Sequence, residues 1–420
     1  MSLKITPVNI AILTISKRNR EGNCGTMLLV HHGEEEPFMA RSSVELFVGG
    51  GGLALGISSA GFKPQLLVEW DRDACNTIAH NKDSWNIVQS DVRTVSFRDY
   101  EGVDLLAGGP PCQPFSLGGR HKGDNDQRNM FPDMIRAVRE IRPKVVIIEN
   151  VKGLLREKFS SYFGYILLQL QYPEVIQKPN EEWYEHLARL EKCHTKGNYK
   201  GLMYRTVFRL VNAADYGVPQ KRERVIIVAL RSDLKQEWSF PNPTHSQEAL
   251  LFSQWVTGEY WDRHGIALKD RPEIPDKLVN KVNKLRQLKL YETAPWQTVR
   301  DAIFDLPDPE FEPSDVPEHL FNPGARIYPG HTGSPLDEPA KTIKAGNHGV
   351  PGGENMLVRL DGSVRYFSVR ESARIQTFPD DYQLLGSWSE SMRQLGNAVP
   401  VRLANIVASS IYTYLDNTAG

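Results

Sequence analysis

Cysteine is scarce in this chain of 420 residues, which contains only Cys24, Cys75, Cys112 and Cys193. The four are widely separated and form no CxxC pair, which argues against a disulfide framework and against a zinc site built from thiolates. Long apolar runs are also missing, and the N-terminus carries no charged-then-apolar leader. We therefore expect free thiols in a soluble, cytoplasmic protein that is not exported.

An excess of charge of either sign is missing as well, because the formal net charge is −1. This balance neither requires nor excludes a nucleic-acid partner, since a basic groove can be offset by acidic surface elsewhere. Internal repeats and low-complexity tracts are absent, and the apolar fraction of 40% is ordinary for a globular protein. The length allows one large domain and a smaller one.

Apolar strands alternate with helical segments between residues 42 and 235. The stretch "VELFVGG" from Val44 has a buried-strand pattern, and "LALGISSAGF" then has helical periodicity up to a glycine. Further strands are predicted at 65–70, 86–91, 103–109, 144–150 and 223–230. Strands this apolar are buried on both faces, which predicts an α/β fold with a doubly wound, mostly parallel sheet.

The rest of the chain divides by composition. Residues 1–41 form an N-terminal extension of unknown role, and 42–235 form the α/β domain. Residues 236–345, rich in Pro, Trp, Asp and Gly, form a smaller irregular domain with one amphipathic basic helix at 277–291. We assign 346–391 to the end of the small domain and a hinge, and 392–420 to a C-terminal helix that returns to the first domain.

Three predicted strand ends carry residues suited to a nucleotide-like ligand. The stretch "ELFVGGGGLALG" lies where the first strand turns into the first helix, although its glycines fit the GxGxxG spacing poorly. Glu69 ends the next strand, where an acid can accept hydrogen bonds from ribose hydroxyls, and Asp91 ends the third. The alternative is that Glu69 and Asp91 are only helix caps or solvated loop acids.

Cys112 lies in "AGGPPCQPFSLGG", after the fourth predicted strand. A cysteine that fills a core belongs inside a strand or helix, and that is our interpretation of Cys75 and Cys193. Prolines stiffen the loop around Cys112, and glycine pairs on both sides let it bend. We therefore predict a reactive thiol on a loop that can close over a substrate.

A carboxyl group and two guanidinium groups are predicted at the same edge. Glu149 ends the fifth strand, where apolar neighbours would raise its pKa and make it a proton donor. Arg222 and Arg224 lie two residues apart just before the sixth strand, and side chains at alternate positions of an extended segment point the same way. Together they could hold an oxygen-rich group.

These strings resemble the motifs of the DNA (cytosine-5)-methyltransferase family, in the family's order, over residues 43–235 and 340–415. The matching stretches are "ELFVGGGGLALG", "GGPPCQPFS", "ENVKGLL", "QKRER", "AKTIKAG", "VRESARIQTFPDDY" and "GNAVPVRLANIV". One departure is Glu45, where the family's usual Asp-Leu-Phe reads Glu-Leu-Phe. The resemblance implies a Rossmann-like methyltransferase domain, a target-recognition domain, and methyl transfer from S-adenosylmethionine to carbon 5 of a flipped-out cytosine.

The resemblance also implies roles for individual residues. Cys112 would add to carbon 6 of the base, Glu149 would donate a proton to ring nitrogen 3, and the pair Arg222 and Arg224 would supply the contact to the carbonyl oxygen, with Arg224 the nearer. The implied cofactor-binding residues are Phe47, Gly49, Gly51, Glu69, Trp70, Asp91, Val92, Pro110, Asn397 and Val399. The implied DNA-binding residues are Gln113, Ser116, Arg128, Gln220 and Thr342. No metal is implied.

We expect the protein to be a monomer in the bacterial cytoplasm. Its expected partners are double-stranded DNA and a restriction endonuclease with which it would be functionally paired. Sequence choice would come from 236–345, where the basic helix could lie on phosphates or be a solvated surface helix. One alternative is a tRNA cytosine-5 methyltransferase on the same fold. More remote alternatives are an NAD-dependent oxidoreductase and a catalytically inactive DNA-binding protein; the latter is disfavoured because the expected catalytic side chains are present.

Overall fold

The computed structural model describes residues 13–18, 24–29, 41–111, 129–287, 292–329, 332–345 and 355–419. The chain divides into two compact units, 1–40 and 41–420. In the first unit β1 (Leu13–Arg18) and β2 (Cys24–Leu29) form an antiparallel pair. The second unit contains every predicted site residue that the structure describes.

A seven-stranded sheet with the order β5-β4-β3-β6-β7-β9-β8 organises the second unit. Strands β3 to β7 pair in parallel, and β9 runs antiparallel to both of its neighbours. The strand bounds are β3 Ser42–Leu46, β4 Lys63–Glu69, β5 Ile87–Gln89, β6 Leu105–Gly108, β7 Val145–Val151, β8 Tyr204–Asn212 and β9 Glu223–Arg231. This confirms the predicted α/β class, and the strand order reverses beside β3, where such sheets bind ligands.

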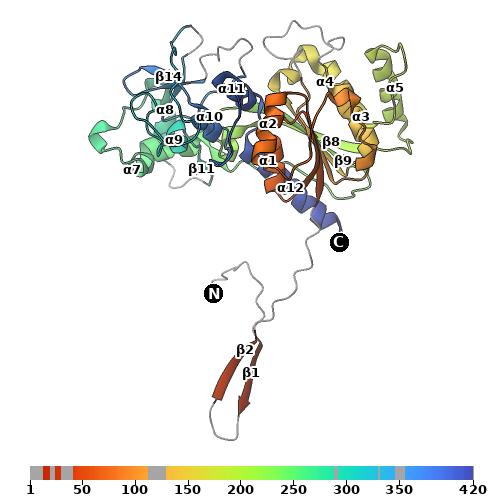
Figure 1. Ribbon diagram of the computed structural model, residues 1–420, viewed down its shortest axis with the longest axis horizontal. Coiled ribbons are helices and arrows are strands. Elements are labelled where there is room, and N and C mark those ends of the chain that lie inside the picture. Colours follow the sequence, from red (N-terminus) through yellow and green to blue (C-terminus); the bar gives the residue numbers. More distant parts are fainter. Residues whose placement is uncertain are drawn as a thin grey trace. The chain divides into compact units, whose positions relative to one another are not determined.

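Helices cover both faces of the sheet (Figure 1). One face packs against α1 (Gly52–Ser59) and α12 (Val401–Ala419), and the other against α3 (Phe131–Ile141) and α4 (Ser160–Gln171). Alternate residues of each strand supply the two cores: Val146 and Ile148 face α3, whereas Val145 and Ile147 face α12. Such double burial explains why the strands have continuous apolar runs.

The direction of β9 differs from that of the other central strands. Its residue Arg224 lies opposite Val151 at the end of β7, because the two strands are antiparallel. A parallel β9 would begin at the opposite edge of the sheet. The reversed direction is therefore what brings the start of β9 to the edge where the parallel strands end.

The smaller, irregular region consists of short elements, as its composition predicts. Its helices are α6 (Gln247–Phe252), α7 (Glu259–Arg263), α8 (Asp276–Leu285), α9 (Val299–Ile303), α10 (Val369–Ile375) and α11 (Trp388–Asn397). Its short strands are β10 (His245–Ser246), β11 (Ala294–Pro295), β12 (Ser334–Pro335), β13 (Met356–Val358) and β14 (Val364–Tyr366). The predicted basic helix is shorter than 277–291, and residues 288–291 lie outside the described part of the chain.

Two more helices belong to the α/β region, α2 (Arg72–Asn81) after β4 and α5 (Trp183–Lys196) after α4. Among the described helices, none combines the length and the apolar character needed to span a membrane. The domain boundaries drawn from composition stay predictions.

Candidate functional site

The turn after β3 is strained and tightly packed. Phe47 has φ 58°, Gly49 has φ 56° and Gly51 has φ 90°, all in the left-handed region. For a phenylalanine this conformation costs about 1–3 kcal/mol, so the surrounding structure must hold it. A Cβ atom on Gly51 would lie 2.7 Å from the hydroxyl of Tyr382, whereas one on Gly49 would meet nothing within 4 Å. The turn thus has a packed side and an open side.

The carboxylate of Glu69 joins the ends of β3 and β4. Its Oε2 accepts a hydrogen bond from the amide of Gly49 at 2.8 Å, and its Oε1 accepts from the amides of Trp70 and Asp71 at 2.9 Å. Glu69 is buried, while the side chain of Trp70 is exposed, with 75% of the residue accessible. A buried acid beside an exposed indole provides both a hydrogen-bond acceptor and a flat apolar wall.

Asp91, after β5, is a capping residue in this structure. Its carboxylate accepts from the backbone amide of Arg93 at 3.0 Å and pairs with the Arg93 guanidinium, which lowers the pKa of Asp91. Val92 beside it is buried. The capping alternative from the sequence is therefore observed for Asp91, and a ligand would have to share the carboxylate with Arg93.

The chain that leads into the cysteine loop passes the carboxyl group of Glu149. A Cβ atom on Gly109 would lie 3.3 Å from Oε2 of Glu149, and the side-chain amide of Asn150 donates to the carbonyl of Pro110 at 3.1 Å. These contacts fix the start of the loop against the end of β7. Four predicted site residues lie outside the described part of the chain: Cys112, Gln113, Ser116 and Arg128.

Glu149 and Arg224 form an ion pair at the edge of the sheet. Nε of Arg224 lies 2.7 Å from Oε1 of Glu149, and the two side chains are 12% and 11% exposed. A charge-assisted bond shielded from water orients both groups strongly. The structure thus brings together these two predicted residues, and the carboxyl group lies beside a guanidinium group rather than among apolar neighbours alone.

Arg222 and Arg224 have different partners, because Arg224 pairs with Glu149 whereas Arg222 binds backbone carbonyls. The guanidinium group of Arg222 is fully buried and donates to the carbonyl oxygens of Ile343, Gly396 and Ala398 at 3.0, 2.8 and 2.8 Å. Arg222 is thus engaged by the chain around residues 343 and 396–398 and has no exposed surface for the expected contact with an oxygen-rich group.

Gln220 is also buried, with no exposed surface, and its Oε1 accepts from the amide of Ile343 at 3.1 Å. This placement differs from the expected DNA contact. Thr342 donates its hydroxyl to the carbonyl of Lys221 at 2.8 Å. Arg222, Gln220 and Thr342 therefore join the segment before β9 to residues 340–343.

The end of α11 reaches the glycine turn. Asn397 is exposed, and Val399 is buried. A Cβ atom on Gly52 would lie 2.3 Å from the carbonyl oxygen of Val399, so the two backbones are in close contact. Among the predicted cofactor residues, Val399 thus lies directly against the start of α1.

Sequence reasoning missed three residues around this edge. Glu45, which the sequence marks only as a departure from the family's usual Asp, is buried, and burial raises its pKa to about 8. Tyr382 donates its hydroxyl to the carbonyl of Gly50 at 3.0 Å, and Arg393 pairs with Asp71 at 2.9 Å. Glu45 and Tyr382 both lie in stretches that match family motifs, whereas Arg393 lies in none of them.

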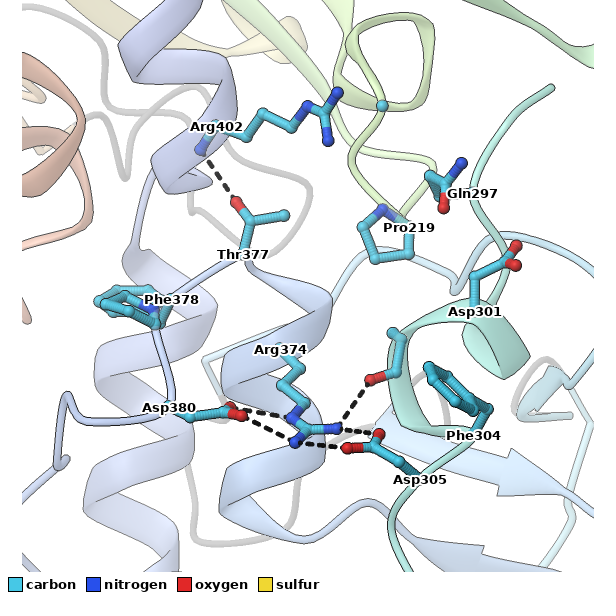
Figure 2. Close-up of a pocket in the computed structure, with 13 residues that line it drawn as sticks. Pro219, Gln297, Asp301, Phe304, Asp305, Arg374, Thr377, Phe378, Asp380 and Arg402 are labelled. Atoms are coloured by element: carbon cyan, nitrogen blue, oxygen red, sulfur yellow. Dashed lines mark hydrogen bonds and ion pairs between the residues drawn. The ribbon is translucent and has the colours of Figure 1, made fainter. Parts of the chain in front are cut away.

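A separate pocket of about 490 Å³ lies between the end of α9, the chain after α10 and the start of α12 (Figure 2). Arg374 spans one wall, paired with Asp305 and Asp380, and Arg402 lies on another. None of the predicted site residues lines this pocket. It is therefore distinct from the edge that carries Glu149.

The strained glycine turn, the buried carboxylate of Glu69 and the pair of Glu149 and Arg224 lie at the edge where the parallel strands end, which is where enzymes with a doubly wound α/β sheet bind their ligands. The family model of the C-5 cytosine-specific DNA methylases matches residues 42–172 and 189–413, and the chain belongs to this family. The prediction of a DNA (cytosine-5)-methyltransferase is thereby confirmed, and the NAD-dependent alternative has no support.

Individual relatives agree with the family. The chain is 34% identical over 388 residues to the type II methyltransferase M.PspPI of Psychrobacter sp. (strain TA137), covering 91% of this chain and 81% of that protein. It is 34% identical over 382 residues to M.Eco47II of Escherichia coli, covering 89% and 79%. A mutant of DNMT2 from Spodoptera frugiperda, 18% identical with a TM-score of 0.54, covers 89% of this chain and 99% of that one, and has the same fold.

Proposed function

We propose that this enzyme transfers a methyl group from S-adenosylmethionine to carbon 5 of a cytosine in double-stranded DNA, through a covalent bond between Cys112 and the base, and releases S-adenosylhomocysteine. The observation that carries the proposal is the shielded pair of Glu149 and Arg224, beside the backbone that leads to Cys112. A proton donor, a cationic group and the route to a thiol meet there.

The described residues fit a nucleoside cofactor. A Cβ atom on Gly49 would meet nothing within 4 Å, and the amide of Gly49 donates to Oε2 of Glu69. That oxygen keeps one further lone pair for a ribose hydroxyl, since the other three of the carboxylate are used by the amides of Gly49, Trp70 and Asp71. The exposed indole of Trp70 and the ring of Phe47 would enclose the adenine. Gly51, Asp91, Val92, Pro110, Asn397 and Val399 would complete the site. When bound, the sulfonium cofactor supplies an electrophilic methyl group; we expect no metal.

The protein's part is to activate the base, since carbon 5 of cytosine is a weak nucleophile. The thiolate of Cys112 forms a bond to carbon 6, Glu149 gives a proton to ring nitrogen 3, and Arg224 stabilises charge at the carbonyl oxygen. The resulting enamine is nucleophilic at carbon 5. After methyl transfer, the proton on carbon 5 passes to solvent, the bond to sulfur breaks and releases the thiolate, and ring nitrogen 3 returns its proton to Glu149.

Arg222 takes a positioning role in this proposal, in place of the direct role first expected. Its three bonds to backbone carbonyls hold the segment before β9 against residues 343 and 396–398. Arg224, two residues later, is thereby fixed where it meets Glu149. Because Gln220 is buried in the same way, we assign it to this support as well.

Base extrusion from the duplex is required, because carbon 5 and carbon 6 are enclosed in the stack. Gln113, Ser116, Arg128 and Thr342 are proposed to contact the DNA, and the region 236–345 to read its sequence. In α8, Lys281 is paired with Glu248 at 2.6 Å, which leaves the exposed Lys277 and Lys284 for phosphates. The type II relatives support a functional pairing with a restriction endonuclease. We propose that the protein acts as a monomer in the bacterial cytoplasm.

A Cys112→Ser variant tests the proposal. Wild-type protein and variant receive cofactor labelled in the methyl group, with duplex DNA in one reaction and tRNA in another. We expect label in DNA with the wild type only, while both proteins bind S-adenosylhomocysteine equally in calorimetry. Turnover by the variant would remove Cys112 from its role, and label in tRNA alone would favour the RNA alternative.

A further inference from the structure

The segment that contains Tyr382 and α11 contacts the cofactor side of the sheet at several points. The side-chain amide of Asn81 donates to the carbonyl of Gln383 at 2.7 Å, and the amide of Gln383 donates back to Oδ1 of Asn81 at 2.8 Å. The amide of Leu385 donates to the hydroxyl of Thr77 at 3.0 Å. These bonds attach the segment to the side of α2.

The same segment reaches the glycine turn. The hydroxyl of Tyr382 donates to the carbonyl of Gly50, and a Cβ atom on Gly50 would lie 3.1 Å from Cβ of Gln394. On the other side of α11, Met392 and Leu395 belong to the apolar core formed with α9 and α10. Helix α11 therefore joins the apolar core of α9 and α10 to the glycine turn.

The charged contact in this set is between Arg393 and Asp71. Nη2 of Arg393 lies 2.9 Å from Oδ2 of Asp71, with the side chains 32% and 25% exposed. Asp71 also caps α2, since its Oδ1 accepts from the amide of Ala74 at 3.0 Å, and its own amide donates to Oε1 of Glu69. One residue thus connects Arg393, the start of α2 and the proposed ribose acid.

We infer that Arg393 is a positioning residue for the cofactor: by holding Asp71 it fixes the turn that carries Glu69 and Trp70, without touching the cofactor itself. This inference rests on the proposed use of S-adenosylmethionine. A carboxylate whose supporting turn is held in place loses less conformational freedom when the ribose binds, and affinity rises accordingly.

Calorimetry on the full chain with S-adenosylhomocysteine, in the absence of DNA, tests the inference. We expect Arg393→Gln to weaken binding about fivefold, or about 1 kcal/mol, and Arg393→Lys to restore part of it. The turnover number at saturating cofactor and the affinity for DNA alone stay unchanged, which a general structural defect would not allow.

The matched control is Glu390→Gln. Nε of Arg393 donates to Oε2 of Glu390 at 2.8 Å, so this change removes the negative charge of the other partner of Arg393 and leaves the bond to Asp71. We expect wild-type affinity. An equal loss in Glu390→Gln and Arg393→Gln would contradict the inference, because it would place the effect within α11.

A second variant avoids dependence on one substitution. Asp71→Asn keeps a side chain that caps helices well but removes the charge that Arg393 meets. We expect Arg393→Gln, Asp71→Asn and the double variant to bind S-adenosylhomocysteine equally weakly, because each of the three lacks the same interaction between Arg393 and Asp71. If Arg393→Gln and Asp71→Asn bind with wild-type affinity, the inference is overturned and the proposed function still stands. If the wild type itself does not bind, both the inference and the proposed function are overturned.

Discussion

At the residue scale, Glu45 shows what a sequence comparison cannot. A replacement of Asp by Glu looks conservative, yet both carboxyl oxygens are buried and have no hydrogen-bond partner among the described residues. Burial raises the pKa of Glu45 to about 8 from 4.5, so the folded chain keeps a proton that the unfolded chain loses. Stability therefore falls as the pH rises from 4.5 to 8.

We expect Glu45→Gln to remove this dependence. Below pH 4.5 the two proteins should be equally stable; above it the variant should become the more stable, by on the order of 4 kcal/mol at pH 8. Urea unfolding at a series of pH values measures this. Parallel stability curves for the two proteins would show that Glu45 is ionised in the folded state.

The ion pair of Glu149 and Arg224 carries a prediction at the same scale. Glu149→Gln cannot transfer a proton, and we expect it to lower the turnover number by about 10²–10⁴ while S-adenosylhomocysteine binds as before. The control is Glu223→Gln, which removes a neighbouring but exposed carboxylate paired with Lys152. Comparable losses in both variants would argue against a proton transfer by Glu149.

At the element scale, the sequence predicts the strands better than their directions. Hydrophobic runs and flanking glycines locate β3, β4, β6, β7 and β9, and Glu149 is placed at its strand end. The direction of β9 depends on pairing between distant segments, which no local pattern records. The edge strand β8 was missed; most of its residues are partly buried or exposed, so it lacks the continuous apolar run of the central strands.

Arg222 illustrates the same limit. Its partners lie more than 120 residues away along the chain, so no local pattern could show that its guanidinium group binds backbone carbonyls rather than a substrate. The burial of Gln220 has the same origin.

Gly396 tests this supporting contact between elements. A Cβ atom there would lie 2.1 Å from the backbone nitrogen of Ala345, and backbone cannot move aside cheaply. We expect Gly396→Ala to destabilise the protein by about 1–3 kcal/mol in urea unfolding. Gly164→Ala in α4 is the control: a Cβ there meets nothing within 4 Å, and the change should stabilise by up to about 1 kcal/mol. Equal changes in stability in Gly396→Ala and Gly164→Ala would contradict a steric clash at Gly396.

At the scale of the whole molecule, the two ends of the second unit close on each other. Helix α12 returns across the chain to pack on α1, where Gly56 allows the close approach: a Cβ atom there would lie 2.4 Å from Cβ of Ala404. Val399, between α11 and α12, thus lies against the start of α1, so both ends of the unit meet at the glycine turn.

The central claim is that Cys112 forms a bond to the target base, and DNA that contains 5-fluorocytosine tests it most directly. Release of the enzyme requires loss of a proton from carbon 5, and a fluorine atom there cannot be removed in this way. The adduct should therefore persist after methyl transfer. Mass spectrometry of the digested complex is expected to show a peptide linked to methylated, fluorinated cytosine through Cys112. Unmodified Cys112 in an active enzyme, or a link to another cysteine, would contradict this account.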